Sequence, residues 1–150
     1  MNHIYLKKIG EDNFLEAFHL QLGFGQERFV SNPIRSLAQA YVYYNQCIPF
    51  GIYVDAAMVG YMMVIYDFDL EEYNIWHMMI DAKFQNRGYG KKALERCLEF
   101  IKTKPYGPSN RVVLTCNTDN KIGMQLYESF GFKPTGNEDE DEIELGLTIQ

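Results

Sequence analysis

The residues best suited to chemistry lie in one short stretch in the middle of the chain, residues 85–91, with the sequence QNRGYGK. A strand-like apolar segment precedes this stretch and apolar residues at helical spacing follow it, so it joins a strand to a helix. The first N–H groups of a helix have no intrahelical partner, and the helix dipole makes that end electropositive. Gly88 and Gly90 let the backbone approach an anion closely, and Arg87 and Lys91 add positive charge. The stretch therefore predicts a phosphate-binding turn at the start of a helix.

Two glycine-rich motifs overlap in this turn. Residues 88–93 (GYGKKA) fit the dinucleotide-binding fingerprint, which requires an acidic residue about 20 positions further on, at the end of the next strand. The next predicted strand, residues 111–116, is followed by Asn117 instead, and only one β-α-β unit surrounds the motif. The alternative motif is Q-x-x-G-x-G, formed by Gln85, Gly88 and Gly90. It resembles the pyrophosphate loop of the GNAT N-acetyltransferases.

A second motif favours the GNAT interpretation. Residues 120–132 (NKIGMQLYESFGF) resemble the N-x-x-A-x-x-L-Y-x-x-x-G-F block of the same superfamily. They follow the first motif by one helix and one strand, as they do in that family. Gly123 stands where the family usually has alanine, and glycine weakens a helix by about 1 kcal/mol relative to alanine. The resemblance implies an α+β fold: a mixed, mostly antiparallel sheet of six or seven strands flanked by four helices, with strands 4 and 5 splayed into a V.

The hydrophobic pattern of the chain agrees with this fold. Helical spacing predicts helices over residues 11–22 and 33–45, a third after the glycine-rich turn, and a fourth that ends at Gly131. The alternation of apolar and polar residues predicts strands over residues 4–9, 49–54, 58–66, 73–80, 111–116 and 143–149. Residues 134–141 are predicted as a turn-rich acidic loop. The sequence shows no internal repeat and no linker, so residues 1–150 are expected to form a single N-acetyltransferase domain.

The resemblance implies that acetyl-CoA is the co-substrate and assigns its binding to three segments. Backbone amides of the turn would hold the pyrophosphate, and the end of the fourth strand would pair with the pantetheine arm. There the N–H of Ile80 is the candidate for polarising the thioester carbonyl. Asn120 would steady the pantetheine, with a role at the helix start as the alternative. The predicted cofactor-binding residues are Met79, Ile80, Gln85, Asn86, Arg87, Gly88, Tyr89, Gly90, Lys91, Asn120 and Tyr127.

The resemblance also implies catalytic residues. Tyr127 occupies the position of a general acid that protonates the thiolate, and a phenol with a pKa of about 10 is protonated at neutral pH. The alternative for Tyr127 is packing beneath the cofactor. Family members often carry a Glu base where this chain has Asn74, so His77 on the same strand becomes the candidate base, with a structural role as the alternative. Glu72 acting through water, or no base at all, are further alternatives.

The acceptor site is the least determined part. Residues between the first two helices cover the acceptor in this family, and the predicted substrate-binding residues are Gln26, Glu27, Phe29, Glu72 and Trp76. Residues 67–73 mix carboxylates with aromatic rings, which suits an ammonium group, and residues 138–142 are wholly acidic. A solvated loop is the structural alternative for both groups.

Loose motifs resemble the bacterial spermine/spermidine (diamine) acetyltransferase branch. They lie in residues 49–53, 59–62 and 76–81. A small primary amine, with polyamines first, is therefore the expected acceptor. A peptide or protein amine, and a catalytically silent acyl-CoA-binding regulator, stay open as alternatives.

Composition excludes several other classes of protein. The net charge of −6 argues against a nucleic-acid partner. The sequence contains no run of about 18 apolar residues, so no membrane-spanning segment is predicted. The N-terminus lacks the pattern of a signal peptide, so a cytoplasmic location is expected. The three cysteines show no C-x-x-C spacing and are predicted to be buried thiols, with neither a disulfide nor a metal site. A homodimer is an open alternative to a monomer.

Overall fold

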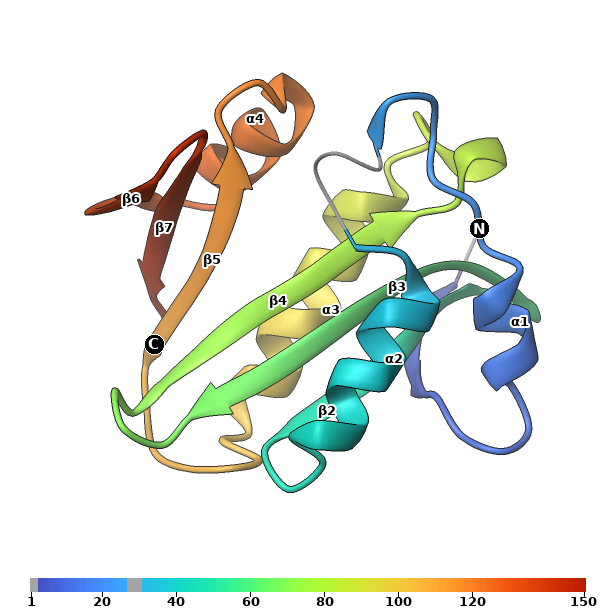
Figure 1. The fold of residues 1–150 in the computed structure, drawn as a ribbon, viewed down its shortest axis with the longest axis horizontal. Helices are drawn as coiled ribbons and strands as arrows, with labels where there is room; N and C mark the ends of the chain where they lie inside the picture. The colour runs from blue at the N-terminus through green and yellow to red at the C-terminus, as the bar shows by residue number, and fades with distance from the viewer. Residues whose placement is uncertain (1–2, 27–30) are drawn as a thin grey trace.

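A central sheet runs through the whole molecule (Figure 1). The computed structural model describes residues 3–26 and 31–150, so the predicted acceptor residues Glu27 and Phe29 lie outside the described residues. The strands are β1 (Ile4–Lys8), β2 (Cys47–Val54), β3 (Ala57–Asp67), β4 (Glu72–Ile80), β5 (Arg111–Asn117), β6 (Lys133–Asp139) and β7 (Glu142–Thr148). The helices are α1 (Phe14–Phe18), α2 (Pro33–Val42), α3 (Tyr89–Lys102) and α4 (Lys121–Ser129), with a short 3-10 helix η2 (Ala82–Phe84).

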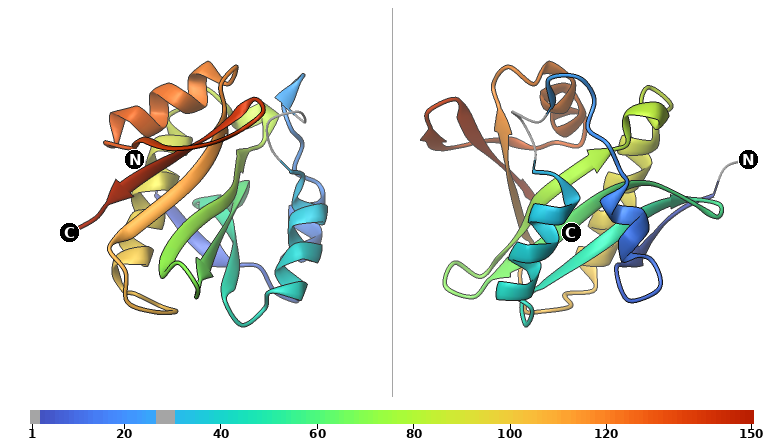
Figure 2. Two further views of the ribbon diagram at one scale, coloured as in Figure 1. Left: turned by 60° about the vertical axis from the view of Figure 1, so that its left-hand side comes forward. Right: turned by 45° about the vertical axis from the view of Figure 1, so that its right-hand side comes forward.

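The strand order confirms the predicted fold class. The seven strands lie in the order β1-β2-β3-β4-β5-β7-β6, and every neighbouring pair is antiparallel except β4 and β5. Helices α1 and α2 cover one face of the sheet, and α3 lies on the other face (Figures 1 and 2). Neither these helices nor any other in the described ranges is long and apolar enough to cross a membrane.

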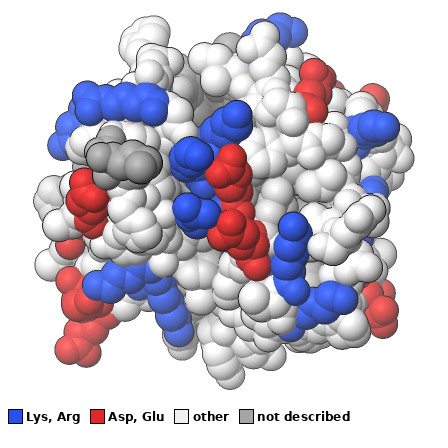
Figure 3. Space-filling view, turned by 180° about the vertical axis from the view of Figure 1, so that it is seen from behind, with Lys and Arg blue, Asp and Glu red and all other residues white. Residues whose placement is uncertain are grey.

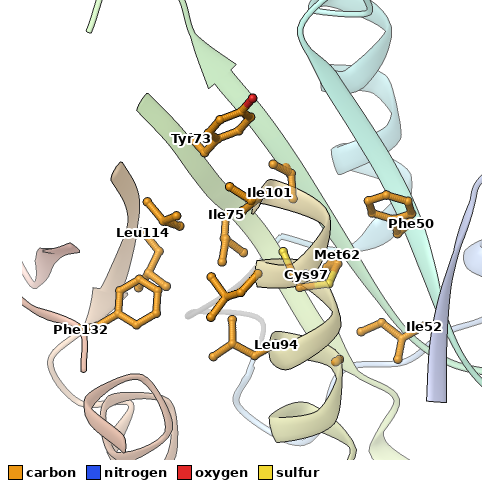
Figure 4. Close-up of a cluster of buried hydrophobic side chains, with 14 of the residues drawn as sticks. Phe50, Ile52, Met62, Tyr73, Ile75, Leu94, Cys97, Ile101, Leu114 and Phe132 are labelled. Carbon is orange, nitrogen blue, oxygen red and sulfur yellow. The ribbon is translucent and has the colours of Figure 1, made fainter. Parts of the chain in front are cut away.

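Two hydrophobic clusters hold the layers together, one on each face of the sheet. The cluster under α3 joins Leu94, Cys97 and Ile101 to the inward side chains of the central strands (Figure 4). The second cluster joins Ala17 of α1 and Ala40 of α2 to the opposite side of β2, β3 and β4. Cys47, Cys97 and Cys116 are buried and free, as predicted. The sheet is therefore covered on both faces over its central strands.

The outer face of α3 is polar. Salt bridges join Lys92 to Glu95 at 3.7 Å and Arg96 to Glu99 at 3.1 Å along this helix. Seen from behind, basic and acidic side chains are interspersed over the surface (Figure 3). This is the pattern of a solvated helix face with stabilising pairs one turn apart.

Strands β4 and β5 separate along most of their length. Their parallel register includes only two residue pairs among the described residues, Tyr73 with Val112 and Asn74 with Val113. The predicted splay between the fourth and fifth strands is therefore confirmed. Beyond these pairs the two strands diverge toward the end of β4, where the glycine-rich turn begins (Figure 1).

Two local predictions were wrong. Helix α1 is only five residues long and ends at Phe18, although Leu20 and Leu22 still pack on the α1/α2 face. Residues 134–141, predicted as a loop, instead contribute most of β6. An edge strand tolerates Pro134, which has no N–H, and Gly136, whose φ is +99°. The pairing of β6 with β7 is interrupted between Pro134 and Glu138.

Candidate active site

A cavity of about 610 Å³ opens where β4 and β5 diverge. Four segments form its wall: the end of β4, the turn before α3, the start of α4, and part of the connection between α1 and α2. The predicted cofactor-binding residues that line it are Met79, Ile80, Gln85, Asn86, Gly88, Tyr89, Gly90, Lys91, Asn120 and Tyr127. The two sequence motifs, separated by a helix and a strand along the chain, therefore meet around one space.

The glycine-rich turn presents backbone to this cavity. Gly88 is the N-cap of α3 with φ +80° and ψ 8°, a left-handed conformation that favours glycine, and it makes no side-chain cap. Asn86 also has a positive φ, of 64°. A Cβ at Gly88 would meet nothing within 4 Å, so the space in front of the helix start is open. The first N–H groups of a helix have no intrahelical partner, so this end of α3 suits a phosphate.

Arg87 is the predicted cofactor residue that is not part of the cavity wall. Its guanidinium lies over the Phe84 ring, 5.6 Å from the centroid, and it donates a hydrogen bond to the carbonyl of Lys83 at 3.4 Å. Arg87 is exposed, so its charge acts on the mouth of the turn rather than inside the cavity.

The amide of Ile80 is directed away from β3. Ile80 lies opposite Gly60, and the next residue, Asp81, donates its N–H to the carbonyl of Val59 at 2.8 Å. In an antiparallel pair successive residues point their amides alternately toward and away from the partner strand, so the N–H and C=O of Ile80 face the β5 side. The C=O accepts a hydrogen bond from Gln85 Nε2 at 2.9 Å. The N–H therefore points toward the gap where β5 has separated.

Gly60 keeps this strand end in place. A Cβ at Gly60 would lie 2.5 Å from the carbonyl oxygen of Met79, a contact that only a backbone shift can relieve. Gly60→Ala is therefore expected to lower the free energy of unfolding by about 1–3 kcal/mol and to reduce acetyl transfer by moving Met79 and Ile80. Thermal denaturation and steady-state kinetics check both effects. Gly10→Ala is the control, because its Cβ would make only an ordinary 3.7 Å contact; equal effects of the two substitutions would contradict the prediction.

Tyr127 projects from α4 to the cavity. Its ring packs edge-on against Phe132, with the centroids 5.9 Å apart and the planes at 67°. Burial is the main cause that raises the pKa of Tyr127 above its ordinary value of 10, with smaller contributions from Cys116 and Cys97. The phenol is therefore protonated throughout the neutral range and can act as a proton donor.

Asn120 has the role at the helix start that the sequence offered as an alternative, and its contact with the pantetheine stays a prediction. It is the N-cap of α4, where its Oδ1 accepts a hydrogen bond from the N–H of Gly123 at 3.1 Å, and it also lines the cavity. A Cβ at Gly123 would lie 2.6 Å from Asn120 Nδ2. The glycine at position 123 therefore makes room for the capping side chain, which sequence comparison with the family alanine did not reveal.

His77 and Trp76 lie outside the cavity wall, on the face of β4 that α1 and α2 cover. A β-bulge interrupts the pairing of β3 and β4 between Met63 and Val64, and the rings of Trp76 and His77 stack at 4.9 Å and 17°. Tyr43 packs edge-on against the ring of Trp76, with the ring centroids 5.8 Å apart. The roles predicted for His77 as a base and Trp76 as an acceptor contact stay predictions.

Gln26 meets the cofactor turn directly. Its side chain exchanges two hydrogen bonds with Gln85, at 2.8 and 3.3 Å. Buried Asp81 reinforces this attachment, because its carboxylate accepts hydrogen bonds from the N–H groups of Gln21 and Lys83, both at 3.0 Å. No pattern in the sequence indicated that Asp81 joins these two segments. The connection between α1 and α2 is thus fastened to the glycine-rich turn by two side chains.

Glu72 lies at the opposite end of β4 from this site. The strand is nine residues long, so its ends are about 26 Å apart at about 3.3 Å per residue. The acidic turn between β3 and β4 is further still from Ile80, and its Asp67 accepts hydrogen bonds from the N–H groups of Asp69 and Leu70, both at 2.9 Å. These local hydrogen bonds account for the position of the Asp67 carboxylate. The structure therefore gives no support to a role for this turn in substrate recognition. The contact predicted between Glu72 and the acceptor stays a prediction.

Glu144 is a carboxylate that sequence reasoning missed. It pairs with Thr115, and the adjacent residues Leu114 and Leu145 belong to the cluster under α3. Because side chains alternate along a strand, Thr115 and Glu144 lie on the face of the sheet opposite α3. Thr135 Oγ1 and Asn137 Nδ2 donate hydrogen bonds to its Oε1 at 2.8 and 2.9 Å. Burial, and secondly the charge of Glu144, raises the pKa of Glu72, whereas Arg111 lowers it. The three charged side chains therefore share one surface.

Comparison with known proteins agrees with this geometry. The sequence model of the Acetyltransferase (GNAT) family matches residues 14–132. The chain is 27% identical over 144 residues to the spermine/spermidine N(1)-acetyltransferase of Bacillus subtilis (strain 168), covering 91% of each protein. It is 32% identical over 65 residues to the N-alpha-acetyltransferase RimI of Mycobacterium tuberculosis, covering 43% of this chain and 37% of that protein.

A solved structure shows the same fold over nearly the whole chain. The dodecameric spermidine N-acetyltransferase from Vibrio cholerae aligns with a TM-score of 0.75 at 15% identity, covering 97% of this chain and 93% of the other. The family match spans most of the sequence, and both family motifs border the cavity between β4 and β5. The chain therefore belongs to the GNAT family of acetyltransferases, and acetyl-CoA is its acetyl donor.

Proposed function

We propose that this acetyltransferase transfers the acetyl group of acetyl-CoA to a primary amine of a small molecule, with polyamines such as spermine and spermidine as the first candidates. The observation that carries the proposal is the match to the Bacillus subtilis spermine/spermidine enzyme, because it extends over 91% of both proteins. The match to RimI covers less than half of either protein. A match along nearly the whole chain includes the segments expected to surround the acceptor, whereas a match over less than half of the chain can leave them out.

The chemistry in this proposal is direct attack of the amine on the thioester in a ternary complex. The N–H of Ile80 would donate a hydrogen bond to the thioester oxygen as negative charge develops there, which is the arrangement of an oxyanion site. Tyr127 would protonate the departing thiolate. The pyrophosphate would lie on the backbone at Gly88 and Gly90, where the start of α3 favours an anion.

The acceptor would approach from the α1/α2 side of the sheet. On that face the carboxylate of Glu144 and the ring of Trp76 are available to a cation with several ammonium groups. A polyamine fits this arrangement because one end can react while another ammonium group is held at a distance. Arg111 on the same surface limits the net negative charge.

An amine panel tests the proposed function. The protein with acetyl-CoA should release CoA in the presence of spermidine or spermine, and mass spectrometry should find one acetyl group on the polyamine. The match to RimI makes a peptide α-amine the second candidate. Turnover of N-terminal peptides without turnover of polyamines would overturn the proposed acceptor and leave the acetyltransferase assignment intact.

Glu144→Gln tests the carboxylate on the acceptor side. It should lower kcat/KM for spermidine by less than tenfold, because a partly exposed charge contributes only about 1 kcal/mol. The loss should shrink as salt is added, since salt screens exposed charges over about 8–10 Å. Glu142→Gln removes the same charge from an exposed position on the same strand and is the matched control. Equal losses for spermidine and for an amine of low charge would assign Glu144 a structural role.

A further inference from the structure

Three side chains form a buried hydrogen-bond chain beneath α2. Ser36 Oγ lies 2.8 Å from Tyr61 Oη and 2.6 Å from His77 Nδ1. Ser36 and Tyr61 are both 0% exposed, and His77 is 9% exposed. Neither the cofactor site nor the two sequence motifs includes Ser36 or Tyr61. The chain joins α2, β3 and β4 at a point where His77 is the member closest to solvent.

The protons available to these side chains determine which atom donates in each hydrogen bond. Tyr61 is fully buried and its hydroxyl has Ser36 as its hydrogen-bond partner among the described residues, so its proton must go to Ser36 Oγ to avoid an unpaired buried donor. Ser36 then has one proton to donate. It can go to His77 Nδ1 at 2.6 Å or to the thioether sulfur of Met63 at 3.9 Å. A nitrogen lone pair is a far better acceptor than a thioether, so Ser36 donates to Nδ1.

This direction fixes the tautomer of the imidazole. If Nδ1 accepts the proton of Ser36, a neutral His77 carries its own proton on Nε2. The doubly protonated form is disfavoured, because burial and, secondly, the positive charge of Arg35 lower the pKa of His77 to about 4. Arg35 lies on α2 beside Ser36, and Tyr61 is the titratable group on β3 that faces this chain. Stacking on Trp76 holds the plane of the ring.

We propose that His77 is a neutral hydrogen-bond donor on the acceptor side of the active site, and that Ser36 is the positioning residue that places its proton on Nε2. This inference rests on the proposed acetyl transfer and replaces the base that the sequence predicted for His77. A nitrogen that already carries a proton cannot take one from the amine. His77 lies on the same face of β4 as Met79, which borders the cavity two residues further along.

An N–H group can donate a hydrogen bond to an oxygen that gains negative charge. The attacking amine needs its lone pair for the new C–N bond, so this lone pair is not free to accept a hydrogen bond. As the C–N bond forms, the thioester oxygen becomes an oxyanion, and donors aimed at it lower the barrier. The C–S bond then breaks and the thiolate takes a proton from Tyr127. The proton lost by the amine passes to water, and a proton from water restores the phenol of Tyr127. In this scheme the Nε2–H of His77 is a donor on the acceptor side, outside the wall of the cofactor cavity, and His77 exchanges no proton.

Nitrogen-15 NMR of the imidazole tests the tautomer without any turnover. In the parent protein labelled at histidine, His77 should show a protonated Nε2 and an unprotonated Nδ1 from pH 6 to pH 8. Its signals are assigned by their loss in His77→Gln, because the chain also contains His3 and His19. A protonated Nδ1, or an imidazolium at neutral pH, would overturn the proposal whether or not the enzyme acetylates a polyamine.

Two further variants test Ser36 as the positioning residue, and one of them is a control. Ser36→Ala removes the donor to Nδ1 and should produce a mixture of both tautomers. Tyr61→Phe is the matched control, because it also removes one buried hydroxyl but leaves Ser36 its proton, so the Nε2–H tautomer should persist. An unchanged tautomer in Ser36→Ala would show that Ser36 does not set it, which contradicts the inference.

Kinetics separate a donor from a base. In His77→Gln the carboxamide oxygen can accept from Ser36 and the –NH₂ can donate in place of Nε2, so kcat should stay within tenfold of the parent. In His77→Phe, which keeps a ring without a donor, kcat should fall by about 10²-fold or more, with a smaller change in KM. If the Gln variant loses as much as the Phe variant, or if both keep full activity, His77 is not such a donor. Thermal denaturation of both variants shows that each is folded under the assay conditions.

Discussion

Tyr127→Phe is expected to lower kcat by about 10²–10⁴-fold, the range for removal of a general acid. The thiolate of CoA must be protonated as it leaves, and Tyr127 is a protonated phenol on the wall of the cavity between β4 and β5. Affinity for acetyl-CoA should change far less, because the hydroxyl acts on charge that develops only in the transition state. Single-turnover kinetics with a binding titration measure the two effects separately.

Stability and an altered leaving group serve as controls for Tyr127→Phe. The melting temperature should be close to that of the parent, because phenylalanine keeps the edge-on contact with Phe132. An acetyl thioester of a more acidic thiol needs less protonation, so the difference between parent and variant should shrink with such a donor. Because the pKa of Tyr127 is raised, its deprotonation should not cause a loss of parental activity below about pH 10. Parental kcat in the variant would show that Tyr127 only packs.

Gly88→Asp is expected to weaken acetyl-CoA binding by at least about 10²-fold. The backbone there has φ +80°, which costs an L-residue about 1–2 kcal/mol, and the new carboxylate would face the pyrophosphate. Each 1.4 kcal/mol corresponds to a tenfold change in Kd, so the conformational cost and the repulsion together reach two orders of magnitude. Isothermal titration with CoA measures the loss. The stabilisation of the parent by saturating acetyl-CoA should disappear with it.

Gly88→Asn isolates the contribution of charge. Asparagine has nearly the shape of aspartate and is among the residues that tolerate a positive φ, so it repeats the steric change without the carboxylate. It should weaken binding much less than Gly88→Asp, and added salt should narrow the gap between the two variants. Equal losses would place the phosphate elsewhere and leave only a steric effect at this turn.

The two sequence motifs predicted residues that line one cavity because the chemistry of each motif is local. A turn with glycine at the start of a helix binds an anion wherever it occurs, so Gly88 and Gly90 could be assigned before their surroundings were known. Nearly all the cofactor residues predicted from the motifs line the cavity, and Arg87 is the exception. Side-chain direction at an exposed position is not fixed by the sequence pattern, and the Phe84 ring holds that guanidinium outside.

Predictions on the acceptor side were weaker because they depended on distances across the sheet. The acidic residues 67–72 are adjacent in sequence to the strand that binds the cofactor, yet the nine-residue β4 separates them from Ile80 by its whole length. Glu144 is remote in sequence and was missed, but the pairing of β5 with β7 brings it to the face on which we propose that the acceptor binds. Neighbours in sequence along a strand move apart by about 3.3 Å per residue, whereas neighbouring strands lie within 5 Å.

The sequence by itself determined the order of the helices and of the strands other than β6, the apolar faces that bury them, the glycine-rich turn and the position of Tyr127, because each depends on spacing within one segment. The tertiary structure alone decided the direction of the Ile80 amide, the space that Gly123 leaves for Asn120, and the hydrogen-bond chain that joins Ser36 and Tyr61 to His77. These features depend on register and on contacts between residues as far as 41 positions apart. A histidine in an apolar strand can be a base, a donor or a structural residue, and the atom that its Nδ1 meets decides among them.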